Sequence, residues 1–290
     1  MVFNNGGLTV TVSIAWMRKV HNCEELIFLS DSRLSGGHRW DQCPKIMSFP
    51  RADCCLSFAG STDYAYPMMM QVNYAMSSYR RIRTRAMDIT DLKGIILKHI
   101  NNLNDAVRDR IICGVDDADG NEFLFGGYSW VEKKFKIWSY TYIPSQKRYV
   151  EAGKTKRILT SINSDIRIIG DKREDYKKVL RQLLIDRYGE NLPNYLDMEP
   201  FEALCTMLQN VTPADSIGGA PQMIKIYQYQ NYAPVGVYWP EMIPNMPKKN
   251  RTLLGRKMLD FEDTDLWFID PKTCITHHCP ISSEQANNPG

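Results

Sequence analysis

The chain has 290 residues, and its 36 Lys and Arg nearly balance 33 Asp and Glu, which leaves a formal net charge of +3. Its 43% apolar share is ordinary for a globular protein and excludes a disordered or collagen-like chain. No apolar run approaches the roughly 20 residues of a membrane-spanning helix, and the N-terminal residues lack the features of a signal peptide, so we expect a cytoplasmic protein that does not act on membranes.

The first part of the chain shows strand patterns followed by two helical patterns. Apolar and polar residues alternate through residues 9–16, which is the period of a strand with one buried face. The polar segment 19–24 is predicted to be a hairpin loop. Two helices are predicted next, at about 63–83 and 90–107, and the second has a clear apolar face. The predicted strands of this part are 9–16, 25–30, 45–49 and 54–59.

The second part repeats this order. A helix at 172–188 carries a regular apolar stripe and is followed by Gly189, which suits a helix C-terminus. A further helix at 200–210 begins with a proline, as first helical turns often do. After about residue 240 the pattern fades, and 281–290 are expected to be disordered. The predicted strands of this part are 111–115, 122–130, 135–142, 165–169 and 222–229.

Blocks of strands and blocks of helices, with antiparallel hairpins, predict an α+β fold. Two sheets packed face to face, with a helix pair on each outer side, would bury every apolar stripe. The sequence therefore predicts a four-layer αββα sandwich. The methionine-rich segment 64–70 is expected to pack in the core of its own subunit, and the alternative is a subunit interface.

Neither a metal nor a cofactor is expected. The eight cysteines are predicted to be reduced and buried, because an intracellular chain rarely holds disulfides, and none forms a C-x-x-C pair. The segment 274–279 combines two cysteines with two histidines, but its spacing fits no standard zinc finger. No nucleic-acid partner is expected either, because the basic clusters are short and such partners usually require a concentrated basic surface.

Five short motifs occur in a fixed order along these elements. They read Leu-Ser-Asp31-Ser-Arg33, Cys-Pro-Lys45-Ile46, Ser-Phe58-Ala59-Gly60-Ser61-Thr62-Asp63, Ser164-Asp-Ile-Arg-Ile-Ile-Gly170 and Thr212-Pro-Ala-Asp215-Ser-Ile-Gly218-Gly219. In this order, and with these gaps, the motifs resemble those of proteasome β-subunits and their bacterial HslV-like relatives. The match covers roughly residues 9–230.

The resemblance implies an N-terminal nucleophile (Ntn) hydrolase, in which a threonine becomes the first residue of the mature chain by self-cleavage. Its hydroxyl attacks an amide carbonyl, and its freed α-amine, with an ordinary pKa of about 7.7–8.0, takes the proton. The implied function is that of a threonine-type peptidase acting on a peptide or protein. The implied organisation is a propeptide at 1–8, an Ntn-hydrolase domain at 9–240 and a partly irregular C-terminal extension at 241–290.

The resemblance also implies roles for individual residues. Thr9 matches the nucleophile, Lys45 matches the lysine that lowers the pKa at its hydroxyl, and Asp31 matches the acid that holds this lysine. Gly60 matches the glycine whose N–H forms the oxyanion hole, and Asp215 matches the aspartate that supports the α-amine. Each also has a purely structural interpretation, as a strand start, a buried ion pair, a turn glycine or a turn acid.

The chain departs from the family pattern at several positions. Leu8 stands where the family usually has a glycine before the nucleophile. Asp171 and Gly218 replace two serines that help to hold the α-amine. Thr11 or Ser13 is therefore kept as an alternative register for the nucleophile.

Two further functions stay open. The first is a catalytically inactive proteasome-fold subunit that acts as a scaffold. The second is an Ntn amidase acting on a small amide. Both stay open because a fold alone does not determine a function. The resemblance also implies a homo-oligomer, arranged as a ring. Any energy-dependent unfolding of substrates would need a separate ATPase partner, because the chain has no P-loop motif.

Overall fold

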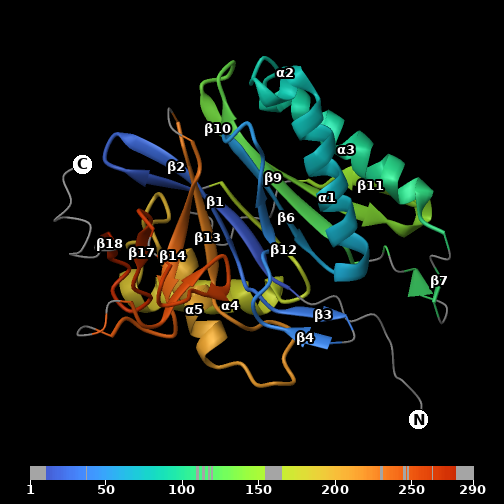
Figure 1. Ribbon diagram of the computed structural model, residues 1–290. Helices are drawn as coiled ribbons and strands as arrows, with labels where there is room; N and C mark the ends of the chain where they lie inside the picture. Colours follow the sequence, from blue (N-terminus) through green and yellow to red (C-terminus); the bar gives the residue numbers. More distant parts are fainter. Residues whose placement is uncertain are drawn as a thin grey trace, which may run out of the picture.

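The structure, a computed structural model, describes residues 11–36, 38–108, 111–112, 115–116, 118, 120–153, 165–228, 231–243, 246, 248–262 and 264–278. Two large sheets, built almost wholly from antiparallel pairs, combine with helices within this part of the chain (Figure 1). The mixture of helices and antiparallel strands predicted from the sequence is therefore confirmed. Thr9 and the segments 1–8 and 281–290 lie outside the described residues.

The larger sheet has nine strands in the order β12-β1-β2-β13-β14-β15-β16, with β17 beside β14 and β18 beside β17. Its β1–β2 hairpin pairs without a break from Ser13 opposite Ser30 to Val20 opposite Cys23. The pair β14–β17 is parallel. The strands are β1 (Ser13–Val20), β2 (Cys23–Ser30), β12 (Ile166–Ile169), β13 (Gln222–Tyr227), β14 (Ala233–Tyr238), β15 (Arg251–Leu253), β16 (Arg256–Lys257), β17 (Trp267–Ile269) and β18 (Thr276–His278).

The second sheet has five strands in the order β11-β10-β9-β6-β5. They are β5 (Ile46–Ser48), β6 (Cys54–Ala59), β9 (Glu122–Ser129), β10 (Lys134–Ile143) and β11 (Arg148–Glu151). A single 3-10 turn (Pro144–Gln146) joins β10 to β11. Two short hairpins lie outside both sheets, β3 (Leu34–Gly36) with β4 (His38–Trp40) and β7 (Ile111–Ile112) with β8 (Val115–Asp116).

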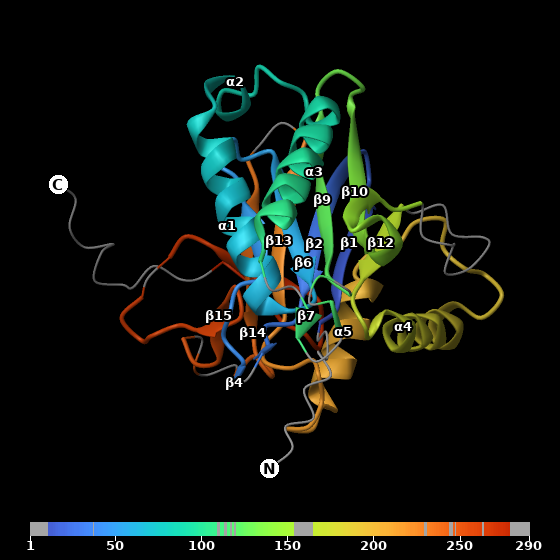
Figure 2. The same ribbon diagram turned by 90° about the vertical axis from the view of Figure 1, so that its right-hand side faces the viewer.

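The helices are α1 (Thr62–Ser78), α2 (Arg80–Arg83), α3 (Ile89–Ala106), α4 (Arg173–Tyr188) and α5 (Glu199–Gln209). α3 begins where the Asp88 carboxylate accepts a hydrogen bond from the Thr90 N–H, which satisfies a free donor of the first turn. α1 and α3 lie side by side over the second sheet in both views, and α4 and α5 lie together against the larger one (Figures 1 and 2).

The alternation of apolar residues explains how the elements pack, because successive side chains of a strand point to opposite faces. In β1, Ile14 and Trp16 pack with residues of α4 and α5. Ala15, between them, packs instead in a cluster that both sheets share. In β6, Phe58 packs with α1 and α3, whereas Cys55 faces the shared cluster. The shared cluster thus holds the two sheets together.

The methionine-rich segment 64–70 packs within its own chain, as the sequence predicted. Tyr64, Ala65, Met68 and Met69 are buried in the cluster formed by α1, α3 and the second sheet. Of the remaining residues of the segment, Tyr66 and Met70 are half-buried and Pro67 is exposed.

Three predictions at element boundaries were wrong. The strand predicted at 111–115 is divided into β7 and β8, which pair as a short hairpin. The polar segment 19–24 is a two-residue turn at His21 and Asn22, and its remaining residues continue the β1–β2 ladder. The segment is polar because its residues are exposed at the end of the hairpin, although most of them belong to the two strands. The helix predicted at 63–83 is divided into α1 and α2, because Tyr79 has an extended conformation, with φ −85 and ψ 108.

The chain after residue 233 contains more regular structure than the sequence indicated. Strands β14 to β18 all join the larger sheet. Most of them have two or three residues, which is too short for alternation to be recognised. β18 contains His277 and His278, and no group of three metal-binding side chains occurs within the part of the chain that the structure describes.

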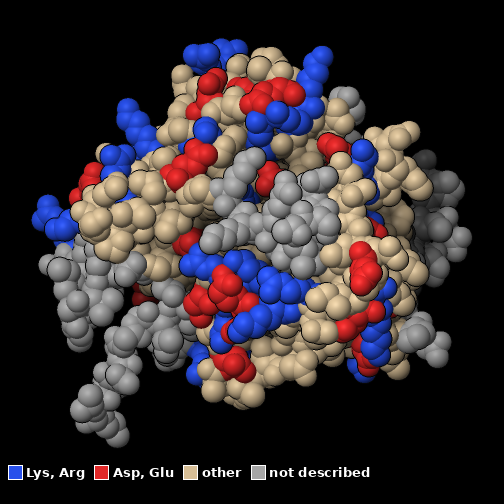
Figure 3. Space-filling model, turned by 180° about the vertical axis from the view of Figure 1, so that it is seen from behind, with Lys and Arg blue, Asp and Glu red and all other residues tan. Residues whose placement is uncertain are grey.

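The surface carries charges of both signs. Figure 3 shows basic and acidic side chains intermixed on the face turned away from the viewer in Figure 1. On α4, for example, Lys177 pairs with Glu174 and Lys178 with Asp175. Among the described helices, none has the length and apolar character needed to cross a membrane.

Candidate active site

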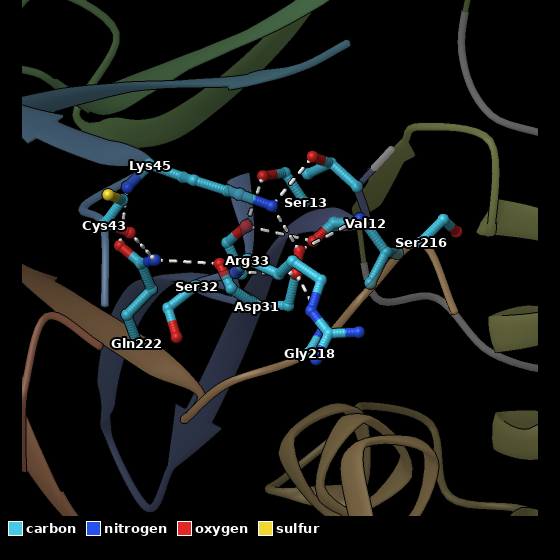
Figure 4. Close-up of polar contacts among 12 residues, drawn as sticks. Val12, Ser13, Asp31, Ser32, Arg33, Cys43, Lys45, Ser216, Gly218 and Gln222 are labelled. Carbon is cyan, nitrogen blue, oxygen red and sulfur yellow. Dashed lines mark hydrogen bonds and ion pairs between the residues drawn. The ribbon is translucent and has the colours of Figure 1, made fainter. Parts of the chain in front are cut away.

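Figure 4 shows a cluster of polar side chains that includes Asp31, Lys45 and Gln222. The cluster is built around the buried side chain of Lys45. Lys45 directly precedes β5, and its side chain has no exposed surface. Its Nζ donates to Asp31 Oδ1 and to Thr11 Oγ1, each at 2.8 Å. An ammonium group is therefore held in contact with a threonine hydroxyl and with the carboxylate that balances its charge.

Asp31 follows the last residue of β2 and is fully buried. Besides Lys45, its carboxylate accepts hydrogen bonds from three backbone N–H groups, those of Val12 (3.4 Å), Arg33 (3.1 Å) and Gly218 (3.1 Å). These donors stabilise the charged form and fix the direction in which the carboxylate faces the lysine.

Burial disfavours charge on both partners of this ion pair. It lowers the pKa of Lys45 from its ordinary value, and Asp31 opposes that shift. It raises the pKa of Asp31, and Lys45 with the backbone donors opposes that shift. Each charge thus persists because the other is present, so removal of either group should disturb the whole site.

Thr11 lies two residues before β1, and a second carboxylate contacts it on its other side. The Thr11 backbone N–H donates to Asp171 Oδ1 at 2.8 Å, and the Ser216 hydroxyl donates to Asp171 Oδ2 at 3.1 Å. Lys45 therefore contacts the hydroxyl of Thr11 while Asp171 contacts its backbone nitrogen. An Ntn nucleophile needs these two atoms, an attacking oxygen and a base, on one residue.

Gln222 connects the segments that carry Asp31 and Lys45. Its amide Nε2 donates to the carbonyls of Asp31 (2.8 Å) and Cys43 (3.1 Å), and its Oε1 accepts from the N–H of Lys45 (2.8 Å). The side chain has no exposed surface. The first residue of β13 thereby fixes the end of β2 relative to the start of β5.

Arg33 holds the loop that leads into β13. Its guanidinium binds both oxygens of Asp41, at 2.6 and 2.9 Å, and donates to the carbonyl of Asp215 at 2.9 Å. A Cβ at Gly218 would lie only 2.4 to 2.6 Å from atoms of this guanidinium. The space that a serine side chain would need at Gly218 is therefore occupied by Arg33.

Glu122, the first residue of β9, holds the loop that carries Asp171. Its buried carboxylate accepts from the N–H of Gly170 at 2.9 Å and from Arg173 at 2.9 Å. Gly170 has φ +105, a conformation that favours glycine. A Cβ at this position would lie 1.9 Å from the carbonyl oxygen of Thr11.

We expect the substitution Gly170→Ala to destabilise the protein by about 2 kcal/mol or more, because the strained φ and the backbone clash act together. Gly94→Ala is the control, since Gly94 lies within α3 and a Cβ at this position would have no atom within 4 Å. It should raise the free energy of unfolding by up to about 1 kcal/mol. Urea unfolding measures both. Equal stability of Gly170→Ala and wild type would contradict the close approach described here.

Gly60 directly follows the second-sheet strand β6, whose end lies close to this cluster. The Ser13 hydroxyl donates to the carbonyl of Phe58 at 3.1 Å, and Ala59 lies against Gly170. Gly60 itself has φ +128, and a Cβ there would lie 2.2 Å from Asn121 Oδ1. The turn therefore requires glycine, whether or not the Gly60 N–H also serves as an oxyanion-hole donor.

The Asp215 side chain forms hydrogen bonds within its own turn. Its carboxylate accepts from the N–H (2.6 Å) and the hydroxyl (2.8 Å) of Thr212, and the first of these hydrogen bonds is the main cause that lowers its pKa. This is the turn geometry that short acidic side chains often adopt. Its backbone carbonyl, by contrast, is one of the acceptors of Arg33.

The structure thus brings together Asp31, Lys45 and the start of β1, and it supplies contacts that the sequence did not indicate. The residue whose hydroxyl meets Lys45 is Thr11, which the sequence left as an alternative, while Thr9 lies outside the described residues. The third candidate, Ser13, donates to Ser30 and Phe58. Residues with positioning contacts that the sequence did not single out are Gln222, Glu122 and Ser216.

Comparison with known proteins gives little further information. No family model matches the chain, and no curated protein matches it. Among solved structures, it is similar to the Anbu (Gly-1) mutant from Hyphomicrobium sp. strain MC1, with 15% identity and a TM-score of 0.48. The likeness covers 77% of this chain and 82% of that one. Such a likeness says nothing about the activity of this chain.

Proposed function

We propose that this chain is a threonine-type Ntn hydrolase, with Thr11 as the nucleophile and with peptides or proteins as substrates. One observation carries the proposal: the fully buried Lys45 ammonium lies 2.8 Å from both the Thr11 hydroxyl and the Asp31 carboxylate. An adjacent positive charge favours the alkoxide form of the threonine, which is otherwise a poor nucleophile at neutral pH.

The proposed fold is the four-layer αββα sandwich of proteasome β-subunits and HslV-like proteins. The order of the sequence motifs supports it, as does the packing of one helix pair against each sheet. The shared cluster between the sheets supports the inner two layers. In this proposal Thr11 lies at one end of the two sheets, close to where β1 and β5 begin and β2 ends.

The proposed mechanism requires that the Val10–Thr11 peptide bond is broken first. The Thr11 hydroxyl adds to the carbonyl carbon of Val10, the bond from this carbon to the Thr11 nitrogen breaks, and the hydroxyl proton ends on that nitrogen. Water then hydrolyses the resulting ester, which restores the hydroxyl and leaves Thr11 with a free α-amine. Only this amine can act as the general base, because an amide nitrogen is not basic.

In the proposed hydrolysis, the α-amine takes the hydroxyl proton while the Thr11 oxygen forms a bond to the substrate carbonyl carbon. The proton then passes to the leaving amine of the substrate, and an ester between Thr11 and the acyl part remains. Water cleaves this ester, with the α-amine again accepting the proton. The Gly60 N–H is the proposed donor to the oxyanion, a role worth about 10² to 10³ in rate.

A panel of short fluorogenic peptides, tested beside small amides, distinguishes the candidate functions. We expect peptides to be hydrolysed and a peptide with a C-terminal electrophile to add its mass to the fragment that begins with Thr11. Hydrolysis of small amides alone would identify an amidase instead. If peptides are not hydrolysed and no label is added, the proposal is overturned in favour of an inactive scaffold.

Self-association is part of the same proposal and rests on the resemblance in the sequence motifs. A homo-oligomeric ring is expected, and an ATPase that unfolds substrates would be a separate protein. Analytical ultracentrifugation of the purified protein would detect the oligomer directly.

A further inference from the structure

The carboxylate of Asp171 occupies a position where the family pattern has a serine. It lies between the backbone nitrogen of Thr11, at 2.8 Å, and the hydroxyl of Ser216, at 3.1 Å. A serine hydroxyl can accept or donate a hydrogen bond, but it remains neutral at every working pH. A carboxylate brings a negative charge to the same nitrogen, which changes how readily this nitrogen holds a proton.

The loop that carries Asp171 is held in place from several directions. The buried Glu122 carboxylate accepts from the N–H of Gly170, the preceding residue. Gly170 itself packs so closely on the carbonyl of Thr11 that no side chain fits between them. On the far side, Ser216 donates to the second oxygen of Asp171. The carboxylate is therefore fixed against Thr11 before any bond is broken, as an efficient electrostatic partner requires.

We propose that Asp171 is a catalytic electrostatic partner of the Thr11 nitrogen, which stabilises the protonated α-amine in each turnover and the positive charge that develops on the nitrogen when the Val10–Thr11 bond breaks. The inference rests on the proposed function and deepens it. Ser216 is the positioning residue that orients the carboxylate.

The chemistry follows from the path of the proton. When the Val10–Thr11 bond breaks, the nitrogen loses its amide character, becomes basic and acquires the hydroxyl proton. Asp171 already accepts its N–H hydrogen bond and stabilises the positive charge that then develops. In each later turnover the same amine is protonated when the hydroxyl attacks and returns its proton to the leaving group. No reactant other than water is needed.

The surrounding charges set the direction of the pH effect. Asp171 favours the ammonium form of the freed amine and so acts to raise its pKa, whereas the Lys45 ammonium acts to lower it. A serine or asparagine at position 171 would remove the first effect and leave the second. The remaining charged groups around this end of the site are Asp31, Arg33, Asp41, Glu122, Lys172, Arg173 and Asp215.

The test compares Asp171→Asn and Asp171→Ser with wild type and with Asp175→Asn. Asp175 is a matched control because it is an exposed acid in the first turn of α4 that pairs with Lys172 and Lys178. The readouts are the pH dependence of kcat/KM for peptide hydrolysis and the rate at which residues before Thr11 are released. Circular dichroism checks that each variant folds, which is expected because Asp171 is exposed.

We expect the acid limb of the kcat/KM profile to move to lower pH by about one unit in both Asp171 variants, since a charge at this distance shifts a pKa by about that amount or more. Release of the N-terminal residues should slow by about tenfold or more, as for a lost electrostatic partner. Asp175→Asn should keep the wild-type profile and rate. Asp171 variants with the acid limb and release rate of wild type would overturn the inference while leaving the proposed hydrolase intact. A wild-type protein that cleaves no amide and keeps residues before Thr11 would overturn both.

Discussion

Thr11→Ala is expected to abolish self-cleavage and peptide hydrolysis together while leaving the fold intact. The hydroxyl that it removes receives the Lys45 hydrogen bond, whereas the Ser13 hydroxyl donates to Ser30 and to the carbonyl of Phe58. The methyl and hydroxyl groups are small, so the loss of stability should stay near that of one buried hydrogen bond, about 1 kcal/mol. The measurements are intact mass, peptide hydrolysis and urea unfolding.

Thr9→Ala is the matched control for this experiment, because it removes the same hydroxyl two residues earlier along the chain. We expect it to release the residues before Thr11 and to hydrolyse peptides at the wild-type rate. The reverse outcome, an active Thr11→Ala protein and an inactive Thr9→Ala protein, would return the nucleophile to Thr9. It would also leave the contact between Lys45 and Thr11 as a structural feature of the strand.

Lys45→Met is expected to have the largest combined effect on rate and stability. Without the ammonium, the Thr11 hydroxyl loses its electrostatic activation, and the rate of hydrolysis should fall by about 10³ or more. The buried Asp31 loses its partner at the same time, which should cost about 3–5 kcal/mol of stability. Peptide hydrolysis and urea unfolding measure the two effects separately.

The stability loss in Lys45→Met should depend on pH with a defined sign. Burial already raises the pKa of Asp31, and removal of Lys45 takes away the main opposing charge. A carboxyl group with a raised folded-state pKa binds more protons in the folded state than in the unfolded state. The destabilisation should therefore grow as pH rises through the Asp31 pKa and shrink in acid.

A double variant, Asp31→Asn with Lys45→Met, separates structure from chemistry. It carries no unpaired buried charge, so we expect it to recover most of the stability lost in Lys45→Met while remaining inactive. Recovery of hydrolysis in the double variant would show that the ion pair serves the fold alone. Wild-type activity in the single variant would exclude Lys45 from the reaction.

The strand alternation in the sequence was sufficient to predict the main elements around the site. Residues 9–16 have a period of two and residues 25–30 form a continuous apolar run, and the structure has β1 at Ser13–Val20 and β2 at Cys23–Ser30. The later strands could not be predicted in this way, because three residues such as Trp267–Ile269 are too few to define a period. Their place in the sheet depends on distant partners such as β14.

The register of the nucleophile could not be predicted for a related reason. Thr9, Thr11 and Ser13 alternate along the strand predicted at 9–16, so a period of two predicts the same face for all three. Choosing among them requires knowledge of which residue meets Lys45, 34 positions away from Thr11 in the sequence. A hydrophobic pattern contains no information on that contact.

The buried polar residues that hold the site could not be predicted either. Gln222 and Glu122 each begin a strand, and both look in sequence like ordinary polar residues at a strand end. Their partners lie 177 and 48 residues away, respectively, at Lys45 and Gly170. By contrast, Asp31 and Lys45 could be proposed because they occur within motifs, and the structure places them in direct contact.

The most direct measurement is the intact mass and N-terminal sequence of the purified, untagged protein. We predict a mature chain that begins with Thr11, because only cleavage of the Val10–Thr11 bond gives the residue beside Lys45 a free amine. A chain that begins with Thr9 would contradict the assignment of Thr11. A chain that keeps residues 1–10 and still hydrolyses peptides would contradict the N-terminal nucleophile mechanism as a whole.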